Sequence, residues 1–367
     1  MPEPTGPFAV GRTMDAWSDG AHADPLAPEP GTPRRLLAWI WYPAAPGQNL
    51  QPVEYLPAPW RTAFERHASV VIIKLVKRDL SRVHAHSLRD AEVSPERRSY
   101  PVVIIRAGLA ALTTGYTTLA EDLASHGYVV VGFDAPYRTT IVVLPDGKVI
   151  QRTDANNADL VGGATRKQLA NKLLQAWTTD VGFALDRLER LNASDPSGRF
   201  TGRLDLQRVG VFGHSLGGAT ALQFCHHDSR CKAGIDVDGM PLGDVLDSAP
   251  THPFMFLLSD HSRDPPAEAR EVQANILSIY NRMPVDGRSL ITIRGANHFM
   301  FSDDSALLGV PLVTPVLRAF GALRIDGRRQ LALAAHYISA FFDVHLKGAP
   351  VSALEKRPAD SEIEFAE

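Results

Sequence analysis

The run GHSLGG at residues 213–218 constrains the fold of this chain more than any other feature. The largely apolar residues 208–212 before it predict a strand, and the residues from Leu216 onward predict a helix. A serine at such a junction needs glycines on both sides, because larger side chains would clash in the sharp turn. The pattern therefore predicts that Ser215 stands above the end of a sheet, over a helix N-terminus that favours negative charge. A chance match in glycine-rich sequence is the alternative.

Strand and helix patterns alternate along most of the 367 residues. Apolar runs predict strands at residues 8–17, 35–42, 100–105, 128–133, 208–212, 233–237, 253–258 and 290–293. Helical spacing predicts helices at residues 116–123, 169–191, 216–224, 266–280 and 331–346, and the turn at 145–147 predicts a hairpin over 139–152. This alternation predicts a mostly parallel sheet covered by helices on both faces. With the serine turn, it predicts an α/β-hydrolase fold, as a single domain over residues 1–367.

Residues 60–95 fit this alternation least well, and we predict a helical insertion there. Residues 64–80 carry apolar side chains at helical spacing, with arginines and lysines around them. The favoured interpretation is a surface helix packed on the core. The alternative is a lid beside the active site, or a peripheral membrane contact through residues 60–87.

The composition argues against some classes of function. A formal net charge of −3 disfavours nucleic acid as a partner, because binding to phosphates needs a basic surface. No run approaches the roughly 20 apolar residues of a membrane-spanning helix. The chain begins MPEPTGPFAVG, which lacks the pattern of a secretory signal peptide, so a secreted or periplasmic location would require that a signal was removed.

The two cysteines, Cys225 and Cys231, are too few for a four-ligand zinc site, and we predict no metal site. They flank the junction between the predicted serine helix and the next strand. In an oxidising compartment they would form a disulfide, whereas in a reducing one they would stay two thiols. The sequence leaves both alternatives open.

His298 is the candidate partner of Ser215. A serine hydroxyl needs a histidine to accept its proton and a carboxylate to orient that histidine. His298 follows the predicted strand 290–293 across a short loop, which places it at the same edge of the sheet as the serine. Surface or packing roles are expected for the histidines at the far end of the serine helix and on the last helix, namely His226, His227, His336 and His345.

The position of the acid is open from the strands alone. Asp238 ends the strand 233–237, and Asp260 follows the next strand, 253–258. Both lie between the serine and the histidine in the chain, which is the order that this fold requires. Asp236 lies on the same face as Asp238 but is expected to remain inside the strand.

Two backbone N–H groups are needed to stabilise the negative oxygen that forms when the serine attacks a carbonyl. One is expected from Leu216, directly after the serine. The other is expected from the loop RAGLA at residues 106–110, where Gly108 permits the turn and Leu109 is the predicted donor. The alternative is a simple tight turn. The aromatic residues nearby either line the pocket or pack in the core: Trp177, Phe299 and Phe301.

Six segments of the chain together match the pattern of a known family: GPFAVG, YPVVIIRAGL, LASHGYVVVGFD, VGVFGHSLGGATALQ, AGIDVDGMPLGD and TIRGANHFMFSD. In these segments the chain resembles the plasma-type platelet-activating factor acetylhydrolases and their bacterial relatives. The likeness reaches to about Asp303 and is thin between residues 60 and 96. The blocks around Asp238 and His298 are more specific than the serine motif, which many hydrolases share.

The resemblance implies Asp238 rather than Asp260 as the acid, His298 as the histidine and Leu109 as an oxyanion donor. It also implies that no metal or organic cofactor is used. One departure concerns the oxyanion loop, where the family usually has His-Gly-Leu-Gly and this chain has Ala-Gly-Leu-Ala at residues 107–110. The pocket shape, and with it the preference for an acyl group, is therefore expected to differ.

These observations predict a serine carboxylic ester hydrolase that works through an acyl-enzyme. The expected substrates are small-molecule or lipid-like esters of short or medium acyl groups, phospholipid-like or polyester-derived. One alternative is a lactonase, peptidase or acyltransferase that uses the same three residues. Another is a catalytically inactive hydrolase fold that serves as a binding protein.

Overall fold

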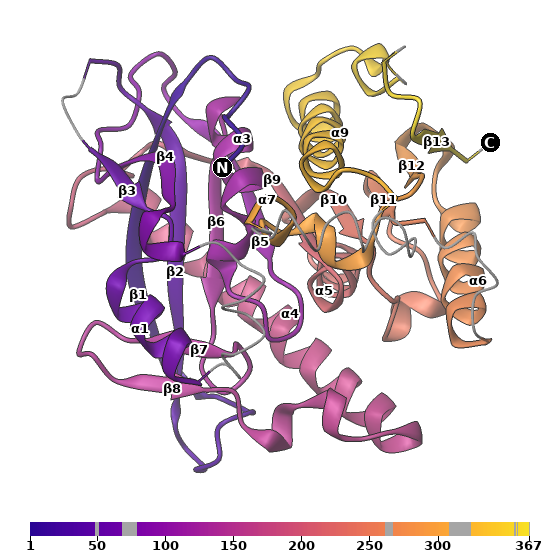
Figure 1. Cartoon of the computed structure of the whole chain (residues 1–367), viewed down its shortest axis with the longest axis horizontal. Coiled ribbons are helices and arrows are strands. Elements are labelled where there is room, and N and C mark those ends of the chain that lie inside the picture. The colour runs from indigo at the N-terminus through magenta and orange to yellow at the C-terminus, as the bar shows by residue number, and fades with distance from the viewer. Residues whose placement is uncertain are drawn as a thin grey trace.

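The computed structural model describes residues 1–47, 51–67, 79–260, 267–307, 324–355, 357 and 359–366. Within them, eleven strands form one sheet (Figure 1). The strands are β1 (Ala9–Ala23), β2 (Pro33–Ala44), β3 (Pro52–Glu54), β4 (His84–Arg89), β5 (Tyr100–Arg106), β6 (Val129–Asp134), β9 (Leu204–His214), β10 (Cys231–Val237), β11 (Phe254–Leu258), β12 (Arg288–Ile293) and β13 (Ile363–Phe365). Their order in the sheet is β13-β12-β11-β10-β9-β5-β6-β2-β1-β4-β3.

Neighbouring strands from β6 through β5, β9, β10 and β11 to β12 all run parallel. β2 pairs antiparallel with β6 and β1, and β13 adds an antiparallel edge next to β12. Every residue of β5, β6 and β11 is buried, as expected for the apolar runs of a parallel sheet that is covered on both faces. The prediction of a mostly parallel sheet is confirmed.

Helices cover both faces of this sheet. The helices include α1 (Ala58–His67), α3 (Thr117–Ser125), α4 (Gly163–Ala193), α5 (Leu216–His227), α6 (Ala267–Arg282), α9 (Gly327–Lys347) and the short α7 (Asp304–Leu307). Successive side chains of a strand point to opposite faces. Val103 and Ile105 of β5 therefore join the core that contains α3 and α9, whereas Val102 and Ile104 join the core that contains α4, α5 and α6.

The predicted hairpin over residues 139–152 is present. Its arms are β7 (Ile141–Val143) and β8 (Val149–Gln151), which pair antiparallel outside the main sheet. Gly147 in the turn has a φ of 82°, a conformation that glycine adopts at little cost.

The prediction of a helical insertion over residues 60–95 is wrong for residues 84–89. These form β4, which lies parallel to β1 and antiparallel to β3 and so extends the sheet. Ala85 and Ser87 are buried and alternate with more exposed neighbours, which is the period of a strand. The Ser87 N–H also donates to the carboxylate of Glu121 on α3 over 2.7 Å. These long-range partners, which the local pattern does not reveal, select the strand.

The start of the segment is helical, since α1 occupies residues 58–67. The helical run that we predict beyond it falls mostly on residues 68–78, outside the described residues, together with its interpretation as a lid or a membrane contact. Where the helices of this protein are described, none combines the length and the apolar character needed to cross a membrane.

Candidate active site

The serine turn has the predicted geometry at the end of β9. Ser215 lies between β9 and α5, with a φ of 57° and a ψ of −124°. Its N–H donates to the carbonyl oxygen of Val237 over 2.9 Å. A Cβ atom at Gly213 would lie 2.2 Å from the Gly217 carbonyl oxygen, and one at Gly217 would lie 2.3 Å from the Arg106 carbonyl oxygen. Close backbone approach therefore requires glycine on both sides of the serine.

Asp238 and His298 are in direct contact. The His298 Nδ1 atom lies 2.7 Å from Asp238 Oδ2, and a carboxylate can only accept that hydrogen bond. Ser259 holds the same carboxylate twice, through its N–H to Oδ1 over 2.8 Å and its hydroxyl to Oδ2 over 2.7 Å. With Nδ1–H bound to a buried carboxylate, the imidazole keeps Nε2 as its basic nitrogen.

The other two carboxylates have different partners. The Asp260 carboxylate accepts from the Gly295 N–H over 2.7 Å and pairs with Arg324 at 3.1 Å. Asp236 lies inside β10, as predicted, and its Oδ1 accepts from the Gly239 N–H over 2.7 Å. Burial raises the pKa of Asp236 well above its usual range. Of the three carboxylates, Asp238 is the one that lies against the imidazole.

His298 is positioned by a clamp that the sequence reasoning missed. It begins the short helix η7 (His298–Phe301), directly after Asn297. Gln330 of α9 accepts from the Asn297 N–H over 3.0 Å and donates to the Asn297 carbonyl over 2.9 Å. Gln330 is fully buried. The available signal was a polar residue at the start of the apolar face of the last helix, but nothing local connects it to a loop 33 residues away.

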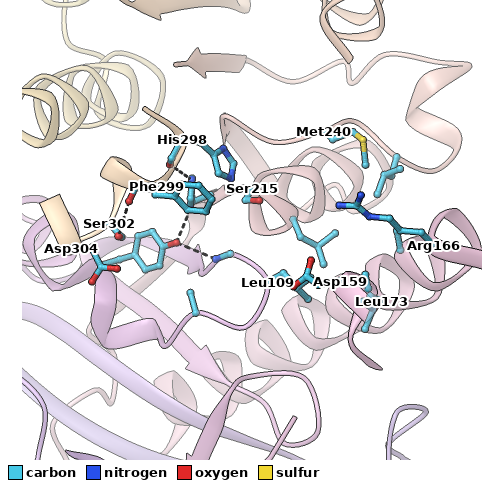
Figure 2. A pocket seen from close by; sticks show the side chains of 18 residues that line it. Leu109, Asp159, Arg166, Leu173, Ser215, Met240, His298, Phe299, Ser302 and Asp304 are labelled. Atoms are coloured by element: carbon cyan, nitrogen blue, oxygen red, sulfur yellow. Dashed lines mark hydrogen bonds between the residues drawn. The ribbon is translucent and has the colours of Figure 1, made fainter. Parts of the chain in front are cut away.

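Ser215 and His298 line the same cavity, which has a volume of about 430 Å³ (Figure 2). In this view His298 and Phe299 lie on one side of Ser215, with Leu109, Arg166 and Met240 on the other. The lining is mainly apolar and includes three charged side chains: Asp159, Arg166 and Asp304.

The aromatic residues near the site divide between the two roles predicted for them. Phe299 lines the cavity and is 71% exposed. Phe301 is buried in the core, with its ring 5.9 Å from that of His214. Trp177 is also buried, and the Arg106 guanidinium lies 4.6 Å from its ring centre.

The two predicted oxyanion residues lie beside the cavity, where both leucines contribute to its lining. Leu216 is the first residue of α5, so its N–H has no acceptor within the helix. Leu109 lies in the loop after β5. That loop is held at Ala110, whose φ is 64° and whose carbonyl accepts from the Thr140 N–H over 3.3 Å.

Cys225 and Cys231 form a disulfide. Next to it, at the end of α5 opposite Ser215, lie His226 and His227. Within the described ranges, the group of these two histidines and Asp244 places potential metal-ligating atoms within 4.8 Å of one another. His227 and Asp244 are exposed and lie 2.9 Å apart, which agrees with the surface role predicted for the histidines.

The comparisons with known proteins concern the fold and the family. The chain is similar along its whole length to the solved ferulic acid esterase from Streptomyces cinnamoneus, with a TM-score of 0.80, 26% identity, and coverage of 100% of this chain and 98% of that one. The α/β-hydrolase fold predicted from the sequence is therefore confirmed.

Among curated relatives, platelet-activating factor acetylhydrolase of Canis lupus familiaris is 27% identical over 221 residues, which cover 56% of this chain and 48% of the relative. The chain thus spans about half the length of the first curated relatives that it matches. A cutinase of Thermobifida fusca is 23% identical over 269 residues, covering 72% of this chain and 75% of the relative. The model of the family "Platelet-activating factor acetylhydrolase, isoform II" matches residues 1–350. This chain belongs to that family.

Proposed function

We propose that the protein is a serine carboxylic ester hydrolase with Ser215 as its nucleophile. The observation that carries the proposal is the 2.7 Å contact between His298 and Asp238, because His298 lines the same cavity as Ser215. A histidine held by a carboxylate at Nδ1 is the base that a serine hydroxyl needs.

The reaction proceeds in two halves. Ser215 Oγ bonds to the ester carbonyl carbon while its proton passes to His298 Nε2, and Asp238 stabilises the imidazolium. The tetrahedral intermediate collapses, the bond to the alcohol oxygen breaks, and the alcohol leaves with the proton from His298. Water then attacks the acyl-enzyme by the same route, which releases the acid and restores Ser215.

The backbone N–H groups of Leu109 and Leu216 are the proposed donors to the negative oxygen of both tetrahedral intermediates. The start of α5 beneath Ser215 adds the positive end of a helix dipole. Losing one such donor costs about 10²–10³-fold in kcat in enzymes of this type.

The proposed substrates are esters of short or medium acyl groups. Apolar side chains dominate the cavity, and a second cavity of about 410 Å³ shares its boundary at Arg166, Ala170, Met240 and Leu242. An ester with a longer alcohol or acyl part has room to extend there. The names of the relatives, an acetylhydrolase, a cutinase and a ferulic acid esterase, favour ester hydrolysis over the lactonase, peptidase and acyltransferase alternatives.

The test is hydrolysis of p-nitrophenyl esters of increasing acyl length by wild type and by Ser215→Ala. We expect wild type to favour the short and medium esters and the variant to lose at least about a thousandfold in kcat. Circular dichroism and unfolding curves control for the fold of the variant.

Labelling with a fluorophosphonate gives a second readout that does not depend on the ester. We expect labelling of wild type at Ser215 and none of Ser215→Ala. Folded wild type that neither hydrolyses any ester nor reacts with the probe would favour the inactive binding protein instead.

A further inference from the structure

Tyr116 and His214 form a buried chain of hydrogen bonds next to the serine. The Gly108 nitrogen lies 3.2 Å from Tyr116 Oη, which lies 2.7 Å from His214 Nδ1. At the other end, His214 Nε2 lies 2.8 Å from the carbonyl oxygen of His298. The chain therefore runs from the predicted oxyanion loop, through the residue before Ser215, to the backbone of the predicted base (Figure 2).

The direction of each hydrogen bond follows from its end groups. The carbonyl of His298 can only accept, so His214 Nε2 must carry a hydrogen. Burial lowers the pKa of His214 to about 3, so the ring is neutral and its Nδ1 is an acceptor. Tyr116 must then donate its hydroxyl hydrogen to Nδ1, and its oxygen accepts from the Gly108 N–H.

The side chains of Tyr116 and His214, which form the middle of this series of hydrogen bonds, are both buried. Tyr116 is 2% exposed and His214 is 7% exposed, so water does not readily replace a lost partner. The ring centres of His214 and His298 lie 4.6 Å apart. A neutral His214 at this distance allows His298 to take up a proton without repulsion between two cations.

We propose that Tyr116 and His214 are positioning residues that keep the oxyanion loop at Gly108 and the backbone of His298 in register with Ser215. This inference rests on the proposed function of Ser215 and His298. The conformation of Gly108 sets where the next N–H, that of Leu109, points. Glycine is the residue least able to fix its own conformation. The hydrogen bond from the Gly108 N–H to the buried Tyr116 hydroxyl supplies that constraint, and the bond from Tyr116 to His214 holds the hydroxyl in place.

The first test is Tyr116→Phe, which keeps the ring and removes the hydroxyl. We expect kcat on a p-nitrophenyl ester to fall about 10- to 100-fold with KM changed less than about twofold, because a small displacement of catalytic groups affects the transition state most. Tyr128→Phe is the matched control. Tyr128 is a buried tyrosine that does not line the cavity, and its hydroxyl donates to Asp343 with a hydrogen-bond length of 2.8 Å. We expect this control to leave kcat unchanged.

Two substitutions at position 214 test separately the hydrogen bond to Tyr116 and the hydrogen bond to the His298 carbonyl. In His214→Asn the side-chain oxygen replaces Nδ1 and still accepts from Tyr116, whereas His214→Gln places an N–H group near the His298 carbonyl. We expect each variant to retain more kcat than His214→Ala. An Ala variant as active as wild type, with Tyr116→Phe equally active, would overturn the inference while the serine-esterase proposal stands.

The third measurement does not depend on turnover. The ¹⁵N chemical shifts of the His214 ring, assigned by their loss in His214→Asn, report which nitrogen carries the hydrogen. We expect the Nε2–H tautomer at pH 7, in wild type and in Ser215→Ala alike, and a shift of the Nδ1 signal in Tyr116→Phe. An Nδ1–H tautomer, or no response to Tyr116→Phe, contradicts the inference even in a protein with no measurable esterase activity.

Discussion

At the scale of single residues, two aspartates that follow neighbouring strands differ in what they contact. The Asp238 carboxylate lies 2.7 Å from His298 Nδ1 and is held by Ser259. The Asp260 carboxylate supports the backbone at Gly295 and pairs with Arg324. Asp238 is thus placed to orient the imidazole, whereas Asp260 is placed to hold the loop that leads to it.

We therefore predict that Asp238→Asn lowers kcat on p-nitrophenyl esters about 10⁴-fold, because an amide no longer fixes the tautomer of His298. Asp260→Asn keeps an acceptor for the Gly295 N–H and loses a partly exposed ion pair. We expect kcat within about tenfold of wild type and a free energy of unfolding lower by up to about 1 kcal/mol. A larger loss of kcat in the Asp260 variant than in the Asp238 variant would assign the role of the acid to Asp260.

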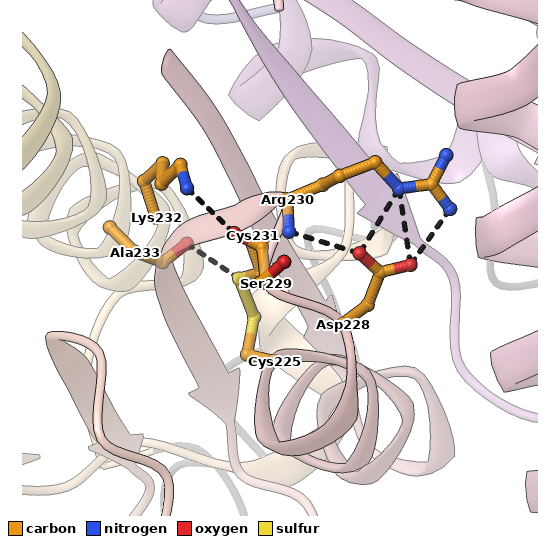
Figure 3. The surroundings of a disulfide bond; sticks show 7 residues. All are labelled: Cys225, Asp228, Ser229, Arg230, Cys231, Lys232 and Ala233. Carbon is orange, nitrogen blue, oxygen red and sulfur yellow. Dashed lines mark hydrogen bonds and ion pairs between the residues drawn. A yellow bond between two sulfur atoms is a disulfide. The ribbon is translucent and has the colours of Figure 1, made fainter. Parts of the chain in front are cut away.

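At the scale of elements, the disulfide joins the helix that begins directly after Ser215 to the strand that ends before Asp238 (Figure 3). Within the short loop between the two cysteines, Arg230 pairs with Asp228 at 2.7 Å. Structural disulfides persist in oxidising compartments. The bond thus corresponds to the oxidising alternative that the sequence left open for these two cysteines.

We predict that replacing Cys225 and Cys231 by alanine lowers the free energy of unfolding by about 2 kcal/mol, the chain-entropy value for a loop closed by residues six apart. Ser215 and Asp238 lie at the ends of α5 and β10 that are remote from the disulfide. Esterase activity of the double variant at 25 °C is therefore expected to stay within a few-fold of wild type. Urea unfolding with and without dithiothreitol measures the effect. Reductant is expected to destabilise wild type and leave the double variant unchanged; an equal shift in both would count against this role.

At the scale of the whole molecule, a buried arginine joins segments that are far apart in the chain. Arg138 donates to both oxygens of Asp24, in the connection between β1 and β2, over 2.9 and 2.8 Å. It also donates to both oxygens of Asp180 on α4, over 3.0 and 2.8 Å. All three side chains are buried. This guanidinium is the shorter-range cation for both carboxylates, with Arg34 also 3.7 Å from Asp180, and burial without a partner is costly for a charge.

We predict that Arg138→Met lowers the free energy of unfolding by about 3–5 kcal/mol, since it removes the paired cation of buried Asp24 and leaves buried Asp180 with the more distant Arg34 at 3.7 Å. Arg208→Met is the control, because Arg208 is 43% exposed and pairs with Asp205 at the surface. We expect that change to cost less than about 1 kcal/mol. Guanidinium unfolding at pH 7 measures both; similar losses in the two variants would refute the buried network as a main link between these segments.

The sequence by itself determined the serine turn, the alternation of strands and helices, and the placement of His298. These features depend on short-range chemistry. Glycines at residues 213 and 217 are required by contacts within the turn and with the adjacent strand, and apolar runs such as residues 100–105 can only be buried strands or helices. His298 follows its strand by a loop too short to carry it elsewhere.

Only the tertiary structure decided which carboxylate faces the histidine. Strand position left Asp238 and Asp260 equal, and the resemblance to a family favoured the first; the contact itself depends on how the loop before His298 crosses the ends of β10 and β11. The same holds for Gln330 and for the Tyr116–His214 pair, whose members lie 98 residues apart. It holds also for residues 84–89, which became a strand because β1 and β3 pair with them. Contacts between distant segments leave no periodic trace in the sequence, because they are fixed by the order of the strands in the sheet and not by the neighbours along the chain.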